Sequence, residues 1–98
     1  MRSNKEVRDD IIEKLTTVVD PELNIDIVNL GLIYNVDLDE DGICLVEMTL
    51  TTMGLADMVT RALRDIPEIK NVDVEFVWEP MWTTDRLSRY AKLALGIH

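Results

Sequence analysis

The chain has 98 residues with a formal net charge of −9, and 47% of the residues are hydrophobic. This length fits one domain, 1–98, whose modest core needs no disulfide. The negative charge argues against a nucleic-acid partner, because phosphate contacts need clustered Lys and Arg.

The sequence also argues against secretion, membrane insertion and histidine catalysis. No apolar run approaches the roughly 20 residues of a membrane span, and the charged N-terminus does not resemble a signal peptide. We therefore expect a cytoplasmic protein without a membrane partner. Cys44 is the only cysteine, which excludes an internal disulfide, and His98, the only histidine, is the last residue.

Hydrophobic periodicity predicts three helices and three strands. Ser3 and Glu6 have capping-box spacing, and a helix is expected over about 4–18, before Pro21. Alternation predicts strands over 31–38 and 43–51, joined by an acidic turn at 39–42 that we interpret as a solvated hairpin tip. A second helix carries an apolar stripe from Leu55 to Ile66, and a third strand covers 71–78. Thr84 is expected to cap a final helix that stops at Gly96.

The order helix-strand-strand-helix-strand-helix predicts an α+β two-layer sandwich, in which helices cover a small mixed three-stranded sheet. The second and third strands should be parallel and joined by a helical crossover. Alternation places two sets of side chains on the core face, Cys44, Val46, Met48 and Leu50 in the second strand and Val72, Val74, Phe76 and Trp78 in the third. We interpret Cys44 as a buried apolar side chain and not as a metal ligand.

Two unusual segments carry the strongest functional signal. The first runs from Asp20-Pro21-Glu22-Leu23 through Ile25-Asp26-Ile27-Val28-Asn29-Leu30 to Gly31-Leu32-Ile33-Tyr34, and the second is Val77-Trp78-Glu79-Pro80-Met81-Trp82. A connecting segment as apolar as 20–30 must pack against the core, so its carboxylates are held in place. Together the segments resemble the SufT/PaaD-like iron–sulfur cluster assembly family, over almost the whole chain.

The chain departs from that family after the second strand. Members usually read Thr-Leu-Thr-x-x-Gly-Cys-Pro-Leu, whereas this chain reads Thr49-Leu50-Thr51-Thr52-Met53-Gly54 and then Leu55-Ala56-Asp57. The family's Cys-Pro is missing, and about half a dozen residues of the following helix with it. The shorter helix should expose residues such as Met48 or Phe76 and so favour a homodimer. Alternatively the given sequence omits a segment, which a chain break between Gly54 and Leu55 would support.

Six residues match the family motifs and are our candidates for partner binding: Asp20, Glu22, Thr51, Thr52, Gly54 and Trp82. Each also has a structural interpretation. Asp20 can close a turn beside Pro21, the two threonines can cap the second helix, and Trp82 can cover one end of the core. The residues themselves leave these alternatives open.

The resemblance implies a non-enzymatic adaptor in iron–sulfur cluster assembly or delivery to apoproteins. Its partners would be iron–sulfur assembly proteins and apoprotein clients. No catalytic, cofactor-binding or metal-binding residue is expected, and no cofactor is expected to bind stably, although a cluster shared transiently with a partner fits the family. One alternative is a PaaD-like accessory subunit that matures one multi-subunit metalloenzyme. A less favoured alternative is a small acid–base enzyme that uses Asp20 and Glu22.

Overall fold

The computed structural model describes residues 2–49 and 53–97. The elements follow in the order α1 (Asn4–Leu15), β1 (Val19–Asp20), β2 (Ile25–Asp26), β3 (Ile33–Leu38), β4 (Ile43–Met48), α2 (Met53–Leu63), β5 (Asn71–Phe76), a 3-10 helix (Thr84–Arg86) and α3 (Arg89–Leu95). No helix in the described ranges is long and apolar enough to cross a membrane.

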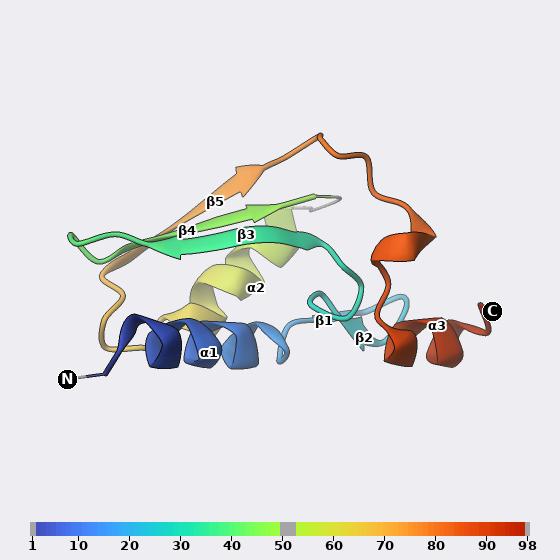
Figure 1. The fold of residues 1–98 in the computed structure, drawn as a ribbon, viewed down its shortest axis with the longest axis horizontal. Coiled ribbons are helices and arrows are strands. Elements are labelled where there is room, and N and C mark those ends of the chain that lie inside the picture. Colours follow the sequence, from blue (N-terminus) through green and yellow to red (C-terminus); the bar gives the residue numbers. More distant parts are fainter. Residues whose placement is uncertain (1, 50–52, 98) are drawn as a thin grey trace.

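Strands β3, β4 and β5 form one sheet in that order. β3 is antiparallel to β4, and β4 is parallel to β5, with α2 as the crossover between them. Helices α1 and α2 cover one face of this sheet, whereas the short β1–β2 pair and α3 lie beyond its end (Figure 1). The α+β two-layer sandwich predicted from the sequence is confirmed.

The core lies between the sheet and the two long helices. Val7, Ile11 and Leu15 of α1 are buried at helical spacing, and Val59 and Leu63 of α2 meet them. On the sheet side, alternate residues of β4 are fully enclosed, as the alternation predicts: Cys44, Val46 and Met48. Each large apolar side chain buried in this way stabilises the fold by about 1.5–3 kcal/mol.

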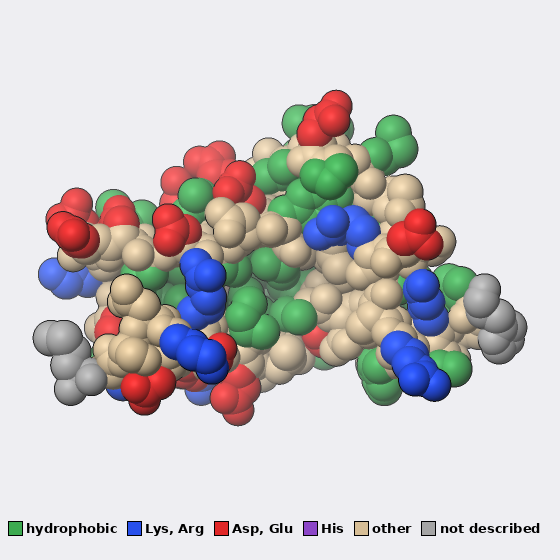
Figure 2. All heavy atoms as spheres, in the orientation of Figure 1, with side chains coloured by type: hydrophobic (Ala, Val, Ile, Leu, Met, Phe, Trp, Pro, Cys, Tyr) green, Lys and Arg blue, Asp and Glu red, His purple; other side chains and the backbone are tan. Residues whose placement is uncertain are grey.

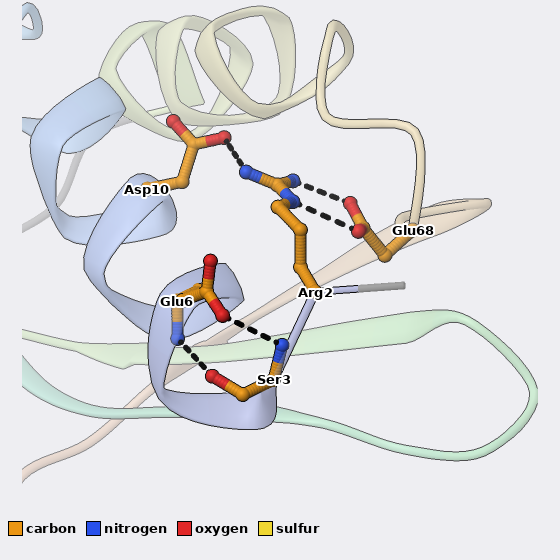
Figure 3. Close-up of polar contacts among 5 residues, drawn as sticks. All are labelled: Arg2, Ser3, Glu6, Asp10 and Glu68. Carbon is orange, nitrogen blue, oxygen red and sulfur yellow. Dashed lines mark hydrogen bonds and ion pairs between the residues drawn. The ribbon is translucent and has the colours of Figure 1, made fainter.

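The start of α1 is fixed by the predicted capping box. The Ser3 hydroxyl accepts a hydrogen bond from the Glu6 amide, and the Glu6 carboxylate accepts one from the Ser3 amide (Figure 3). Arg2, just before the box, pairs with Asp10 and makes two hydrogen bonds to Glu68, which lies between α2 and β5 (Figure 3). This network holds the N-terminal segment against the loop between α2 and β5.

Helix α1 is shorter than predicted, since it ends at Leu15 and not near 18. The hydroxyls of Thr16 and Thr17 bond back to the carbonyls of Glu13 and Lys14, which satisfies the last turn. Threonine side chains of this kind compete with helix propagation. Val18 can therefore turn into the core and lead directly into β1.

The final helix also begins later than predicted. Thr84 starts a 3-10 turn, and the cap of α3 is Ser88, whose hydroxyl accepts a hydrogen bond from the Ala91 amide at 3.1 Å. The predicted stop at Gly96 is confirmed, because Gly96 has a φ of 73° in the left-handed region. Tyr90 is 61% exposed on this short helix.

The prediction that Trp78 faces the core is wrong. β5 ends at Phe76, and the chain then leaves the sheet, so alternation no longer sets the direction of the next side chains. Trp78 is 78% exposed. Of the two residues expected to be uncovered by the short α2, Phe76 is 40% exposed, but Met48 is fully buried. Met48 lies on the central strand between β3 and β5, whereas Phe76 lies on an edge strand.

Candidate functional site

The segment from 20 to 30 packs down as predicted, and its carboxylates are used to shape it. β1 and β2 form a two-residue antiparallel ladder, and Ile25, Ile27 and Leu30 are buried. One carboxylate oxygen of Asp20 accepts hydrogen bonds from the amides of Glu22 and Leu23, at 2.9 and 3.0 Å.

The alternative of a small acid–base enzyme depends on where Asp20 and Glu22 lie. Asp20 closes the turn that contains Pro21, while Glu22 is exposed in that turn. Neither residue lines the two cavities described below. Asp26, which is not one of the six candidate contacts, accepts hydrogen bonds from the backbone amide and the side-chain amide of Asn29, at 3.0 and 2.6 Å. The carboxylates of Asp20 and Asp26 therefore order this loop.

Three consecutive carbonyl groups receive the C-terminal part of the chain. The Ser88 amide donates to the Asn29 carbonyl, the Trp82 indole to the Leu30 carbonyl, and the Arg86 side chain to the Gly31 carbonyl, at 2.9, 2.9 and 3.0 Å. Trp82 is partly buried and packs against the core. The hydrogen bond from its indole therefore supports the structural interpretation of Trp82.

The start of α2 is the place where the family places its cysteine. Gly54 lies in the first turn of this helix and is exposed. The alternative that the given sequence omits a segment after Gly54 stays a prediction. Thr51 and Thr52 lie outside the described residues, as does Leu50, and their predicted roles stay predictions.

The only thiol is poorly suited to bind a cluster. Cys44 has no exposed surface, and it lies on β4 opposite Leu38 and beside Val72. Burial, with the nearby charge of Asp37, raises the pKa of the Cys44 thiol to about 11, so the neutral form persists at physiological pH. In the part of the chain that the structure describes, no group of three or more His, Cys, Asp or Glu side chains could hold a metal ion. An iron–sulfur cluster, which needs thiolates, does not fit these residues.

The segment after β5 carries Trp78, which the sequence analysis placed in the core, and Met81. The Trp78 ring meets the Phe76 ring edge-on, with 4.5 Å between centroids, and Met81 is 80% exposed. The backbone beneath them is tied down, because the Tyr34 hydroxyl donates to the Pro80 carbonyl. The Arg86 guanidinium lies 3.8 Å from the centre of the Tyr34 ring. One part of this surface was expected from the sequence, because the short second helix should leave Phe76 uncovered.

A groove of about 390 Å³ runs between α1 and the edge strand β3, and a second of about 250 Å³ adjoins it. Both are lined by Arg8 and Val36, and the Arg8 guanidinium donates to the Val36 carbonyl at 3.2 Å. The walls are mostly apolar, and the bond from Arg8 occupies one acceptor on the free edge of the sheet. Of the predicted site residues that the structure describes, none lines either groove: Asp20, Glu22, Gly54 and Trp82.

The model of the family described as "Iron-sulfur cluster assembly protein" matches residues 8–76, more than two thirds of the chain. The chain belongs to this family. It is 54% identical to the Fe-S protein maturation auxiliary factor YitW of Bacillus subtilis (strain 168), across 93% of this chain and 95% of the relative. It is 55% identical to the Fe-S protein maturation auxiliary factor SufT of Staphylococcus aureus (strain USA300), across 82% of this chain and 98% of the relative.

The fold of this family member is also found in a solved structure. The crystal structure of a domain of unknown function, DUF59, from Bacillus anthracis has a TM-score of 0.84 with 39% identity, and the match covers 96% of this chain and 95% of that one. The agreement extends over β1–β2 and α3 as well as the sheet, because so little of either chain is left out.

The same comparisons measure the shortening of this family member. The YitW alignment spans 97 positions but uses 93% of the 98 residues, about 91, so about six positions of YitW have no residue here. For SufT, 86 positions use 82%, about 80 residues, and again about six are unmatched. This is the number that the sequence predicts to be missing after Gly54.

Proposed function

We propose that this chain is a non-enzymatic accessory protein in the assembly of iron–sulfur clusters or their delivery to apoproteins. The observation that carries the proposal is its 54–55% identity, over most of its length, to two proteins named Fe-S protein maturation auxiliary factors. The cluster is cargo in this proposal. Donor and client proteins supply its ligands, and this chain supplies surfaces that bring the two together.

The state of the single thiol supports an adaptor that contributes no ligand. A thiolate is needed to bind iron, and Cys44 is enclosed and stays protonated. A cluster shared transiently with a partner would need Cys44 to leave the core, at the cost of the packing around it. We therefore propose that cluster transfer proceeds without this residue.

The finer expectations remain part of the proposal. We propose a cytoplasmic protein whose partners are iron–sulfur assembly proteins and apoprotein clients, with Asp20, Glu22, Thr51, Thr52, Gly54 and Trp82 as candidate contacts. A PaaD-like dedication to one metalloenzyme differs only in the number of clients. The homodimer stays a prediction.

The proposal is tested in a strain that lacks the gene for this chain. The readout is the activity of an iron–sulfur dehydratase relative to its protein level, with and without added iron and sulfide after lysis. We expect wild type and Cys44→Ala to restore activity equally, and purified wild type to show no cluster absorption after anaerobic reconstitution. Failure of wild type to restore the cluster-containing fraction would refute the proposal. Loss of rescue in a folded Cys44→Ala protein would refute its ligand-free form.

A further inference from the structure

Three large apolar side chains lie in solvent at the carboxyl end of β5. The exposed fractions of Phe76, Trp78 and Met81 are 40%, 78% and 80%. The rings of Phe76 and Trp78 stack edge-on at 4.5 Å. Exposed apolar patches on soluble domains commonly mark interaction sites, and aromatic residues and Met are enriched at their centres.

The backbone that presents these side chains is fixed at both ends. The Val77 amide donates to the Met48 carbonyl at 2.9 Å, which continues the ladder of the sheet. The carbonyl of Pro80 accepts the Tyr34 hydroxyl, and the Trp82 indole donates to the Leu30 carbonyl at 2.9 Å. Because the segment is already ordered, a partner that binds it pays little for ordering the backbone.

The charged side chains of the segment that carries this surface are all acidic, and the first basic residue after it, Arg86, lies against the Tyr34 ring. Residues 71–85 contain no Lys or Arg, and their acidic side chains are all exposed: Asp73, Glu75, Glu79 and Asp85. Figure 2 shows hydrophobic side chains gathered over the segment that follows β5, with acidic side chains beside them and Lys or Arg atoms at their lower edge. A second copy of this chain would bring an identical acidic rim against this one, and each copy carries a net charge of −9.

We propose that Phe76, Trp78 and Met81 form a docking surface for a different, folded protein whose apolar cleft is bordered by Lys and Arg. Trp78 and Met81 enter the cleft, and the basic border pairs with the acidic rim. This inference rests on the proposed adaptor function, and it makes the occupant of the surface a cluster donor or an apoprotein client. It also disfavours a homodimer through this face.

The test places a photoreactive residue on the surface of the full chain in its own cell. Trp78→p-benzoylphenylalanine is compared with Leu93→p-benzoylphenylalanine, a matched control at a position that is 64% exposed on α3. Mass spectrometry identifies the protein and the residue joined to position 78. The identified protein is then purified and titrated with wild type, Trp78→Ala and Leu93→Ala at low and high salt, after unfolding midpoints have shown that both variants are folded.

We expect position 78 to join a different protein, at an apolar site flanked by Lys or Arg, to a greater extent than position 93. Trp78→Ala should weaken binding of that protein at least about tenfold, in the range of interface hot spots, while Leu93→Ala leaves it unchanged. Salt should weaken the wild-type complex. Joining to a second copy, to lipid, or to no protein beyond the control overturns the inference, as does unchanged binding by Trp78→Ala.

The outcomes separate this inference from the proposed function. If the protein joined to position 78 has the expected surface but no part in iron–sulfur assembly, the docking surface stands and the adaptor proposal fails. If Trp78→Ala rescues dehydratase maturation as well as wild type and binds the same protein equally, the adaptor proposal stands and the docking surface fails.

Discussion

Replacing Gly31 by Ala should damage the fold far more than the same change at Gly96. Both glycines have positive φ angles, 71° and 73°, so an Ala side chain meets the same backbone penalty of about 1–2 kcal/mol at each. The difference lies in the surroundings. A Cβ at 31 would lie 2.2 Å from the Arg86 carbonyl oxygen, whereas a Cβ at 96 has no neighbour within 4 Å.

The extra cost at Gly31 follows from what must move. Ordinary contact begins at 3.4 Å, so the 3-10 turn has to retreat by more than 1 Å from Gly31. That movement strains the hydrogen bonds from Arg86 to Gly31 and from Ser88 to Asn29, each of which contributes about 1 kcal/mol. We expect a loss of about 3–4 kcal/mol for Gly31→Ala and of about 1–2 kcal/mol for Gly96→Ala.

Urea unfolding followed by circular dichroism measures both losses under identical conditions. For a domain of this size the difference corresponds to a melting temperature lower by about 4–8 °C for each kcal/mol. Equal losses in the two variants would refute the reasoning, because they would show that the C-terminal turn moves freely away from Gly31.

Three other predictions follow from contacts described above. Arg2 lowers the pKa of the Glu68 carboxyl through hydrogen bonds, so the pair adds stability above the unfolded pKa of about 4.3, and this stability is lost as pH falls through the lower folded pKa. In urea unfolding, the stability advantage of wild type over Arg2→Gln should therefore be constant from about pH 7 to 5 and shrink toward about pH 3. A difference that does not depend on pH contradicts this prediction. Glu47 and Glu75 are neighbours in register across β4 and β5, and their like charges repel. Glu75→Lys should therefore raise the free energy of unfolding by about 0.2–1 kcal/mol at low salt and by less in 1 M salt. A gain that high salt does not reduce contradicts this electrostatic cause. Iodoacetamide should leave Cys44 unmodified in the native protein at about pH 8 and modify it in urea, since the thiol is buried and its pKa is about 11; native labelling at the unfolded rate would refute its burial.

The parts of the fold that depend on local chemistry were predictable from the sequence. Ser3 and Glu6 cap α1 as their spacing predicts, and Gly42 takes its positive φ of 84° in the turn between β3 and β4. Apolar alternation placed Cys44 and Val46 in the core because β4 is the central strand, covered by helices along its length.

The wrong predictions have one physical origin: the periodicity of apolar residues does not show where a strand or a helix begins and ends. Trp78 continues the alternation of β5, but the strand ends two residues earlier. Ser88 replaces Thr84 as the helix cap because a 3-10 turn intervenes, and that turn is set by contacts with Gly31 more than 50 positions away. The candidate contacts at Thr51 and Thr52 remain predictions, while Asp20 and Trp82 also carry structural hydrogen bonds.

The three adjacent carbonyls of Asn29, Leu30 and Gly31 make the C-terminal part of the chain a single unit of local unfolding. If the indole, the guanidinium and the Ser88 amide leave together, Leu87 and Ala91 leave the core at the same moment, because both are buried side chains of this same segment. Amide hydrogens from 87 to 97 should then exchange with solvent at one common rate, faster than those of β4. The sheet would persist through such openings, so the C-terminal segment can detach and return while the rest of the domain stays folded.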